Sequence, residues 1–181
     1  RAWNKTFSLP IITTHCCNNF GPYQLPEKLI PLIILNAIEH KDLPIYGNGK
    51  QIRDWIYVED NVNIVLELIK HGKVGENYNI SLNNSFKNIE IVREICKILD
   101  YLLPSSKISS YLELIKYVQD RPSHDVKYEL NAKKINSLLH YKSKTSFNYA
   151  LTKTVKWYLS NLKWVSNIKN VKNLTKRQGL L

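Results

Sequence analysis

Two arginines occupy positions where they could hold a phosphate group. Arg53 follows the tight turn Gly47-Asn-Gly49, and Arg121 lies in a polar, proline-containing segment. A guanidinium offers a planar fork of N–H donors that matches two phosphate oxygens, and it stays charged at physiological pH. Only five of the 26 basic residues are arginines. We therefore predict that Arg53 and Arg121 bind an anion; an ion pair with a neighbouring carboxylate, Asp54 or Asp125, is the structural alternative.

Other chemistry-bearing patterns are weak. The spacing Tyr-x-x-x-Lys, which on a helix lets lysine lower the pKa of a proton-transferring tyrosine, occurs at Tyr46…Lys50 and Tyr149…Lys153. The first pair straddles the Gly-Asn-Gly turn, and no Gly-rich dinucleotide motif or P-loop precedes the second. The run His15-Cys-Cys17 lacks a second ligand pair at metal-site spacing. We predict neither a catalytic residue nor a metal ligand in this chain.

The net charge of +11 is unevenly distributed. Residues 1–130 contain 15 acidic and 15 basic residues, whereas residues 131–181 contain 11 basic residues and no acid. This pattern favours a solvated basic helix face and tail, and it leaves a nucleic-acid surface as the alternative. A hydrophobic content of 44% with 10% aromatic residues excludes a disordered chain.

Compartment signals indicate a cytoplasmic protein without a membrane segment. Three cysteines without framework spacing favour a reducing compartment. The longest apolar run, residues 29–35, contains Pro31 and is far shorter than the roughly 20 residues of a membrane span. The chain begins at Arg1 and contains no Met, so we expect it to be a piece of a longer protein.

Strand and helix patterns alternate along the chain, which predicts an α/β or α+β fold. Strands are predicted over 9–15, 43–46, 51–58, 77–81 and 115–119, and helices over 26–40, 61–71, 89–100, 131–140 and 146–164. The Gly-Asn-Gly turn predicts that strands 43–46 and 51–58 pair as a hairpin. Expected N-cap residues are Asp60, Asn88, Asn131 and Ser146. Residues 101–114 and 120–125 are expected to be loops, and 165–181 a frayed end.

Several segments together resemble one family of nucleotide-sugar enzymes. Residues 18–29 read Asn-Asn-Phe-Gly-Pro-Tyr-Gln-Leu-Pro-Glu-Lys-Leu, and residues 120–125 read Asp-Arg-Pro-Ser-His-Asp. With 43–60, 72–80 and 87–89, they resemble the dTDP-glucose 4,6-dehydratases, which are extended short-chain dehydrogenases. The resemblance covers residues 1–165. It implies an α/β fold: the C-terminal part of a Rossmann-type NAD-binding fold plus the smaller mixed α/β substrate-binding lobe.

The resemblance also implies a division of the chain and an activity. Residues 1–25 would end the NAD-binding portion, 26–165 would form the substrate lobe with returning strand and helix segments, and 166–181 would be a divergent basic tail. The family, a group of homodimeric lyases in deoxysugar and cell-surface polysaccharide synthesis, oxidises C4 of the glucose of dTDP-glucose with NAD, eliminates water across C5–C6 and returns hydride to C6. Its catalytic residues would precede Arg1, so we expect the isolated chain to be inactive.

Site residues follow from the matched motifs. The resemblance assigns Asn19 to NAD and a larger set to the dTDP-sugar. Arg53 and Arg121 would bind the diphosphate. Pro44 and Tyr46 would form an apolar and aromatic shelf for thymine, and edge-strand packing is the structural alternative for these two residues. The full expected substrate set is Asn18, Lys28, Leu29, Pro44, Ile45, Tyr46, Arg53, Asn88, Asp120, Arg121 and His124.

The chain departs from the family pattern in several places. Cys17 replaces Ser, Phe20 replaces Tyr, Asn48 replaces Asp, and Ser123 replaces Gly; residues 81–86 replace a Gly-rich loop. After Trp164 the resemblance ends. Three alternatives stay open at this stage: a related nucleotide-sugar epimerase or decarboxylase, a non-catalytic basic binding module, and a decayed gene fragment.

Overall fold

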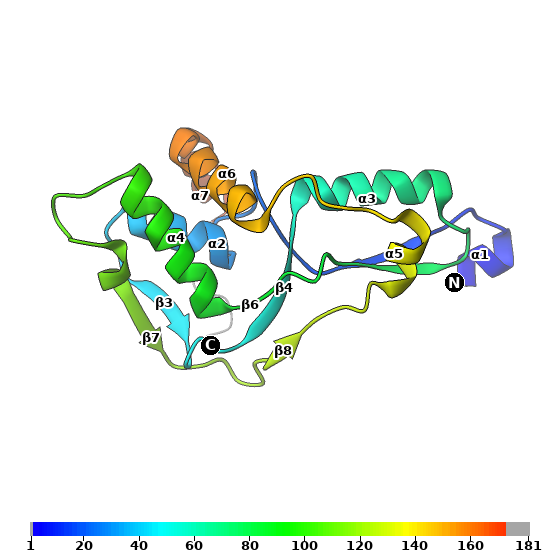
Figure 1. Cartoon of the computed structure of the whole chain (residues 1–181), viewed down its shortest axis with the longest axis horizontal. Coiled ribbons are helices and arrows are strands. Elements are labelled where there is room, and N and C mark those ends of the chain that lie inside the picture. The colour runs from blue at the N-terminus through cyan, green and yellow to red at the C-terminus, as the bar shows by residue number, and fades with distance from the viewer. Residues whose placement is uncertain (1, 173–181) are drawn as a thin grey trace.

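The computed structural model describes residues 2–172 as an elongated mixed α/β fold (Figure 1). Helices are α1 (Ala2–Phe7), α2 (Leu29–Ile38), α3 (Val58–His71), α4 (Asn88–Leu102), the 3-10 helix η1 (Tyr111–Leu114), α5 (Lys133–Leu139), α6 (Phe147–Ser160) and α7 (Leu162–Lys172). Strands are β1 (Thr13–Cys16), β2 (Asn18–Phe20), β3 (Leu43–Tyr46), β4 (Ile52–Tyr57), β5 (Asn77–Ile80), β6 (Ser85–Lys87), β7 (Ile115–Val118) and β8 (Lys127–Tyr128).

Strand β4 is the element that joins the two parts of the molecule. It pairs in parallel with β2 and β8 and antiparallel with β6. Successive side chains of a strand point to opposite faces. Accordingly, Trp55 and Tyr57 are buried in one hydrophobic core, and Ile56 is buried in the other.

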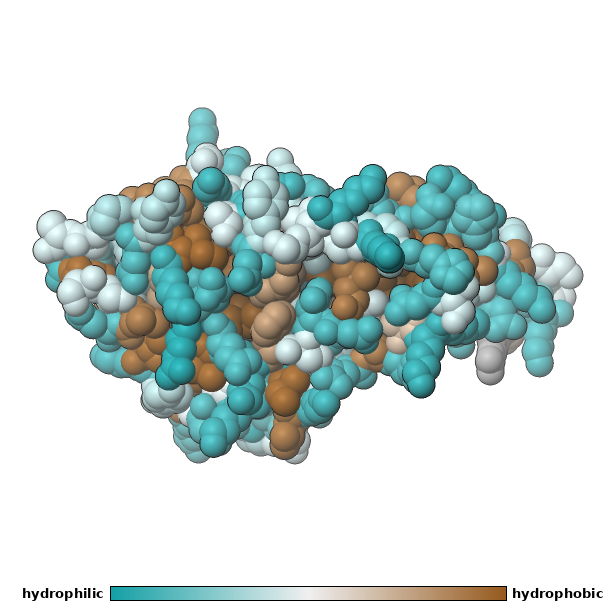
Figure 2. All heavy atoms as spheres, in the orientation of Figure 1, coloured by the Kyte–Doolittle hydropathy of each residue, from teal (hydrophilic) through white to brown (hydrophobic). Residues whose placement is uncertain are grey.

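The two cores have different partners. Around the first lie α2, α4 and α6, with the parallel pair β3–β7 at its edge. The second lies under α3 and α5 against the parallel pair β1–β5. Figure 1 shows β4 between these two groups of helices. Figure 2 shows that hydrophilic side chains cover most of one face, with hydrophobic ones exposed among them.

A buried carboxylate anchors the segment between α5 and α6. Asp60 is 5% exposed and lies in the first turn of α3, where the helix dipole favours negative charge. It accepts hydrogen bonds from the Tyr141 hydroxyl at 2.7 Å and from Ser143 Oγ at 2.8 Å. Burial and this hydrogen bond raise the pKa of Tyr141 to about 12. The prediction that Asp60 is the N-cap is wrong, because α3 begins at Val58 after Tyr57.

The predicted hairpin of 43–46 and 51–58 is also wrong. Strand β3 pairs with β7, and the turn carries the chain out of that pair into the sheet of β4. Gly47 and Gly49 have φ of +56° and +69°. A tight two-residue hairpin turn of type I′ needs positive φ at two consecutive residues. Here Asn48, between the two glycines, does not have a positive φ.

Other differences lie at element ends and in weak segments. Asn18–Phe20 forms a strand, and α1, β6 and β8 are not predicted by the sequence. The expectation of a loop over 101–114 is wrong at both ends, because α4 extends to Leu102 and η1 spans Tyr111–Leu114. The predicted cap Ser146 is confirmed: its hydroxyl accepts from the Tyr149 N–H. The predicted cap Asn131 is wrong, because the N-cap of α5 is Ala132.

The helix predicted over 146–164 is interrupted at Asn161, whose amide donates to the Trp157 carbonyl at 2.7 Å. Asn161 is the C-cap of α6, its backbone N–H donates to the Tyr158 carbonyl, and α7 begins at Leu162. The prediction of a frayed end over 165–181 is wrong for residues 165–172, which lie in α7. Residues 173–181 lie outside the described residues.

Within residues 2–172, no helix is long and apolar enough to cross a membrane. The same residues contain no cluster of three or more metal-ligating side chains. All three cysteines are free thiols; Cys16 is exposed, while Cys17 and Cys96 are buried.

Burial predicts that the three thiols react unequally. It raises the pKa of Cys17 and raises that of Cys96 to about 12, so neither forms the nucleophilic thiolate at neutral pH. We expect a thiol reagent at pH 8 to modify Cys16 alone in the folded chain and all three in denaturant. Mass spectrometry of the labelled peptides checks this, and prompt labelling of Cys96 without denaturant would contradict the packing described.

Candidate functional site

Polar side chains from three segments meet where β3 and β7 end. Tyr46 is the register partner of Val118, and the Gly47 N–H donates to the Val118 carbonyl at 2.9 Å. The two strands therefore deliver the turn after β3 and the segment after β7 to one place. We call this the β3–β7 corner; it comprises Tyr46, Gly47, Gln51, Asp120, Arg121 and His124.

Asp120 is the hub of the corner. Its Oδ2 accepts from Gln51 Nε2 at 2.7 Å. Its Oδ1 accepts from the Arg121 N–H at 2.8 Å and from His124 Nδ1 at 2.6 Å. The hydrogen bond from His124, above all, lowers the pKa of the Asp120 carboxyl, with the Arg121 N–H and the Gln51 amide acting in the same direction.

A glycine lets Asp120 come this close. Gly47 has φ of +56°, and a Cβ built there would lie 2.6 Å from Asp120 Oδ2. That distance is well inside van der Waals contact. A side chain at position 47 would therefore strain the backbone and displace the carboxylate from Gln51.

The Arg121 guanidinium lies between two rings. Its Nη2 is 2.8 Å from His124 Nε2, and its Cζ is 5.1 Å from the centroid of the Tyr46 ring. The His124 side chain is only 5% exposed and meets Tyr46 edge to face, with centroids 6.2 Å apart. Arg121 itself is exposed. The site thus presents a cation that is held from behind and faces solvent.

Arg53 connects the corner to β4. Its Nη1 donates to the carbonyl of Asp125 at 3.0 Å and to that of Ile52 at 2.8 Å. Half-buried Arg53 therefore ties the end of segment 120–125 to the central sheet. Among residues 2–172, neither arginine forms an ion pair with a carboxylate, so the expected alternative pairing with Asp54 or Asp125 is not observed.

Asn88 begins α4 directly beside the corner. Its N–H donates to the Gln51 carbonyl at 3.0 Å, and the N–H of Ile89 donates to the Gly49 carbonyl at 3.1 Å. The prediction that Asn88 is the N-cap is wrong, because the cap is Lys87. The Asn88 Oδ1 is buried and has no hydrogen-bond partner among the described residues. An acceptor in this position is available to a ligand donor.

Asn18 and Asn19 lie on β2, next to β4. They are the register partners of Trp55 and Ile56. The Asn19 amide nitrogen donates to the Cys17 carbonyl at 3.1 Å, whereas Asn19 Oδ1 is buried and has no partner among the described residues. This oxygen is a second acceptor that a ligand could satisfy.

The remaining predicted residues lie near the sheet but contribute less to the corner. Ile45 is 1% exposed and packs in the first core, so only its backbone is available; Leu29 packs against the same core. Pro44 precedes Ile45, lies on the opposite face of β3 and is half-buried. The Lys28 ammonium is exposed and lies 3.8 Å from the Glu27 carboxylate. No described hydrogen bond or ion pair joins Lys28 to the corner.

The sequence motifs did not reveal two buried polar residues. Gln51 is 7% exposed and Asp54 is 1% exposed. Asp54 accepts from Ser81 Oγ, and burial raises the pKa of its carboxyl. In the sequence, Gln51 is a single polar residue between the turn and Arg53. Nothing local distinguishes it from an ordinary strand residue, because its partner Asp120 is distant in the sequence. Asn83, in the segment that replaces a Gly-rich loop, has φ of +57°, a conformation that glycine adopts without strain.

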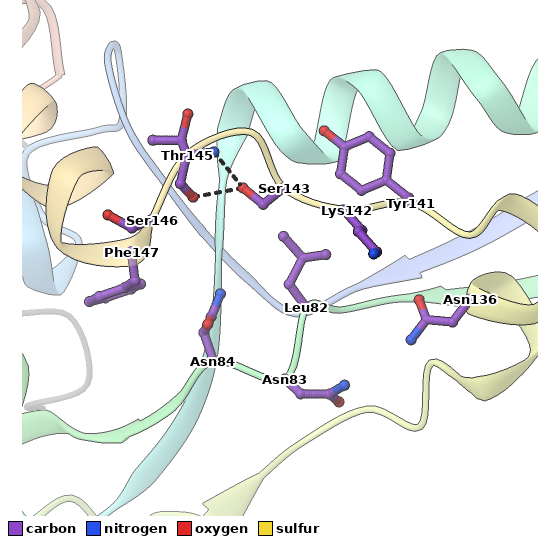
Figure 3. A pocket seen from close by; sticks show the side chains of 10 residues that line it. All are labelled: Leu82, Asn83, Asn84, Asn136, Tyr141, Lys142, Ser143, Thr145, Ser146 and Phe147. Carbon is purple, nitrogen blue, oxygen red and sulfur yellow. Dashed lines mark hydrogen bonds between the residues drawn. The ribbon is translucent and has the colours of Figure 1, made fainter.

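A cavity of about 350 Å³ lies elsewhere, at the carboxyl end of β5 (Figure 3). Its lining comes from the segment after β5, from α5, from the segment between α5 and α6, and from the first residue of α6. The lining residues are Leu82, Asn83, Asn84, Asn136, Tyr141, Lys142, Ser143, Thr145, Ser146 and Phe147. None of the predicted site residues lines this cavity.

Comparisons with known proteins agree with the motifs. The prediction that the resemblance ends after Trp164 is wrong, because a dTDP-glucose 4,6-dehydratase of Escherichia coli is 48% identical over 183 residues, covering 100% of this chain and 51% of that protein. The family model described as GDP-mannose 4,6 dehydratase matches residues 1–154. The chain is 54% identical over 170 residues to dTDP-glucose 4,6-dehydratase 1 of Escherichia coli K12, covering 94% of this chain and 46% of that protein. The chain thus spans about half the length of the curated relatives that it matches.

Solved structures show the same relationship. The NAD complex of dTDP-glucose 4,6-dehydratase from Bacillus anthracis matches with a TM-score of 0.80 and 42% identity, covering 93% of this chain and 50% of that one. The UDP-glucuronic acid 4-epimerase of Bacillus cereus matches with a TM-score of 0.75 and 23% identity over 88% of this chain and 48% of that one. The second match shows the fold alone.

Replacing the glycine beneath Asp120 tests the geometry of the corner. We expect Gly47→Ala to lower the free energy of unfolding by about 1–2 kcal/mol, the usual cost of a left-handed non-Gly residue, with displacement of Asp120 adding to it. Urea titration measures the change, and Lys50→Ala, which removes an exposed side chain at the end of the same turn, is the control. Equal midpoints for the two variants would contradict the described contact.

Proposed function

The chain belongs to the GDP-mannose 4,6 dehydratase family, and from that premise we propose that it provides the nucleotide-sugar-binding part of a dTDP-glucose 4,6-dehydratase. The activity of the whole enzyme would be the conversion of dTDP-glucose to dTDP-4-keto-6-deoxyglucose. That activity would belong to a protein about twice as long as this chain.

The β3–β7 corner carries this proposal. Arg121 offers exposed N–H donors while His124 and Tyr46 hold its guanidinium from behind. Arg53 lies on the strand that is tied to the same segment through the Asp125 carbonyl. We propose that the diphosphate of the substrate lies between these two cations, with the thymine against Tyr46. Asn18, Lys28, Leu29, Pro44 and the backbone of Ile45 would surround the rest of the ligand, and Asn88 Oδ1 would accept from one of its hydroxyls.

Asn19 fits a contact to NAD. Its buried Oδ1 lacks a partner among the described residues, and a nicotinamide carboxamide supplies the N–H donors that such an oxygen needs. NAD, when bound, accepts and returns hydride. The chain itself contains no Gly-rich fingerprint for a dinucleotide diphosphate, so we propose that other residues of the enzyme hold that group.

Two observations favour this reading over the alternatives. The dehydratase relatives are far more similar in sequence than the epimerase neighbour, whose likeness concerns the fold. Basic residues after 130 partly neutralise earlier acids: Lys134 pairs with Glu76 at 2.8 Å, and Lys153 pairs with Glu59 at 3.3 Å. Such pairing lessens the case for a nucleic-acid surface.

Further parts of the proposal concern context. We propose a cytoplasmic homodimeric parent enzyme that supplies deoxysugars such as rhamnose for cell-surface polysaccharides. The free thiols support a reducing compartment. The boundaries at residues 25 and 165 stay predictions; the second core, which combines β1, β5, α3 and α5, is what we assign to the returning Rossmann segments.

Removing either arginine should weaken nucleotide binding. Charge-assisted hydrogen bonds contribute about 1.5–3 kcal/mol, so we expect Arg53→Ala and Arg121→Ala each to lower dTDP affinity by roughly 10- to 150-fold. Isothermal titration calorimetry of the full 181-residue chain measures this. Arg93→Ala, at an exposed position on α4, is the matched control and should bind like the wild type. Wild-type affinity in both Arg53→Ala and Arg121→Ala, or an equal loss of affinity in Arg93→Ala, would contradict the proposal.

Catalysis should require more than this chain. None of its residues is assigned to proton or hydride transfer, so we expect no conversion of dTDP-glucose by the purified chain with NAD. The absorbance of the 4-keto sugar in alkali follows the reaction. Turnover by the chain alone would overturn this part of the proposal.

A further inference from the structure

We propose that Gln51 is a positioning residue that acts through Asp120 to set the tautomer of His124 and so holds Arg121 in its binding orientation. The inference deepens the proposed function and rests on it only for the role of Arg121. Four side chains form one hydrogen-bonded series, from Gln51 to Asp120, from His124 to Asp120, and from Arg121 to His124.

The donors and acceptors in this series permit one arrangement. A carboxylate only accepts and a guanidinium only donates. Asp120 therefore requires a proton on His124 Nδ1 across the 2.6 Å contact. Arg121 requires a lone pair on His124 Nε2 across the 2.8 Å contact. Both conditions are met only by neutral histidine carrying its proton on Nδ1.

Asp120 can select this tautomer of His124 only if its carboxylate is held in one orientation. Its Oδ1 serves both His124 and the Arg121 N–H, so rotation of the carboxylate would misalign both contacts. Gln51 Nε2 holds the opposite oxygen at 2.7 Å, and the absence of a side chain at Gly47 leaves room for it. An amide does not titrate, so this restraint is independent of pH.

Gln51 is well placed for such a role. It is 7% exposed, and its carbonyl accepts from the N–H of Asn88, which fixes its backbone against α4. The charged and titratable groups facing His124 are Asp120 and Arg121 from its own segment and the Tyr46 phenol from β3. None of them replaces the Gln51 donor.

Loss of the Gln51 amide should therefore propagate to Arg121. The Asp120 carboxylate would rotate, the His124 ring would gain access to its Nε2–H tautomer, and that N–H would face the guanidinium. Arg121 would then lose its acceptor and leave the face of Tyr46. A Gln51 that only filled space would affect stability and leave the imidazole unchanged.

The test uses the full chain with ¹⁵N-labelled histidine. Long-range ¹H–¹⁵N spectra distinguish the two tautomers, and the His124 signals are those that His124→Gln removes from the five histidines. We expect the Nδ1–H tautomer in the wild type. Gln51→Met, which keeps the size but removes the donor, should introduce the Nε2–H tautomer and weaken dTDP binding about fivefold, as loss of one hydrogen bond implies.

Two further variants serve as a control and as a substitute for Gln51→Met. Asn36→Leu removes another amide donor, to the Asp42 carbonyl at 2.9 Å, and should change neither His124 nor binding. Gln51→Glu places a carboxylate against Asp120 and reports on the same contact if Gln51→Met folds poorly. It should perturb the tautomer at least as strongly as Gln51→Met.

The outcomes separate this inference from the proposed function. An Nε2–H tautomer in the wild type, or the same His124 spectrum in folded Gln51→Met, would overturn the positioning role. The expected tautomer pattern in a chain that binds no dTDP would support the positioning role and contradict the proposed function.

Discussion

The structure depends on a single strand whose two faces are buried in different cores. On β4, Trp55 and Tyr57 pack with α2, α4 and α6, while Ile56 packs with α3 and α5. A register slip of one residue would exchange every side chain between the two cores. Buried Asp54 specifies the register further, because its carboxylate must face the Ser81 hydroxyl. The two halves of the fold are therefore placed relative to each other by β4.

The candidate site follows from this placement. Arg53 leaves β4 next to Asp54 and holds the Asp125 carbonyl, so the segment after β7 is tied to the same strand. At its other end, this segment is fixed by Asp120 against Gln51, the residue that precedes β4. Both ends of the 120–125 segment are thus fixed by contacts with β4 or the residue that precedes it. These contacts hold a proline-containing loop and its exposed cation, Arg121, in a defined position.

Local patterns were enough to predict most elements but not their partners. Strands 43–46 and 115–119 were recognised from β-branched and apolar residues, and Ser146 was recognised as a cap. The hairpin was mispredicted because a Gly-Asn-Gly turn indicates a change of direction without specifying which strand follows beside it. Asp60 resembled an N-cap, but its carboxylate bonds to Tyr141 and Ser143, which lie more than eighty residues away. Gln51 has its role only through Asp120, a contact that no local pattern encodes.

The central claim is that dTDP binds at the β3–β7 corner. Titration of the ¹⁵N-labelled chain with dTDP, followed by ¹H–¹⁵N correlation spectra, locates the ligand directly. We predict the largest shifts at residues 44–47, 53, 88 and 120–124. Shifts confined to the cavity of Leu82, Asn83, Ser143 and Ser146, with an unchanged corner, would contradict this account.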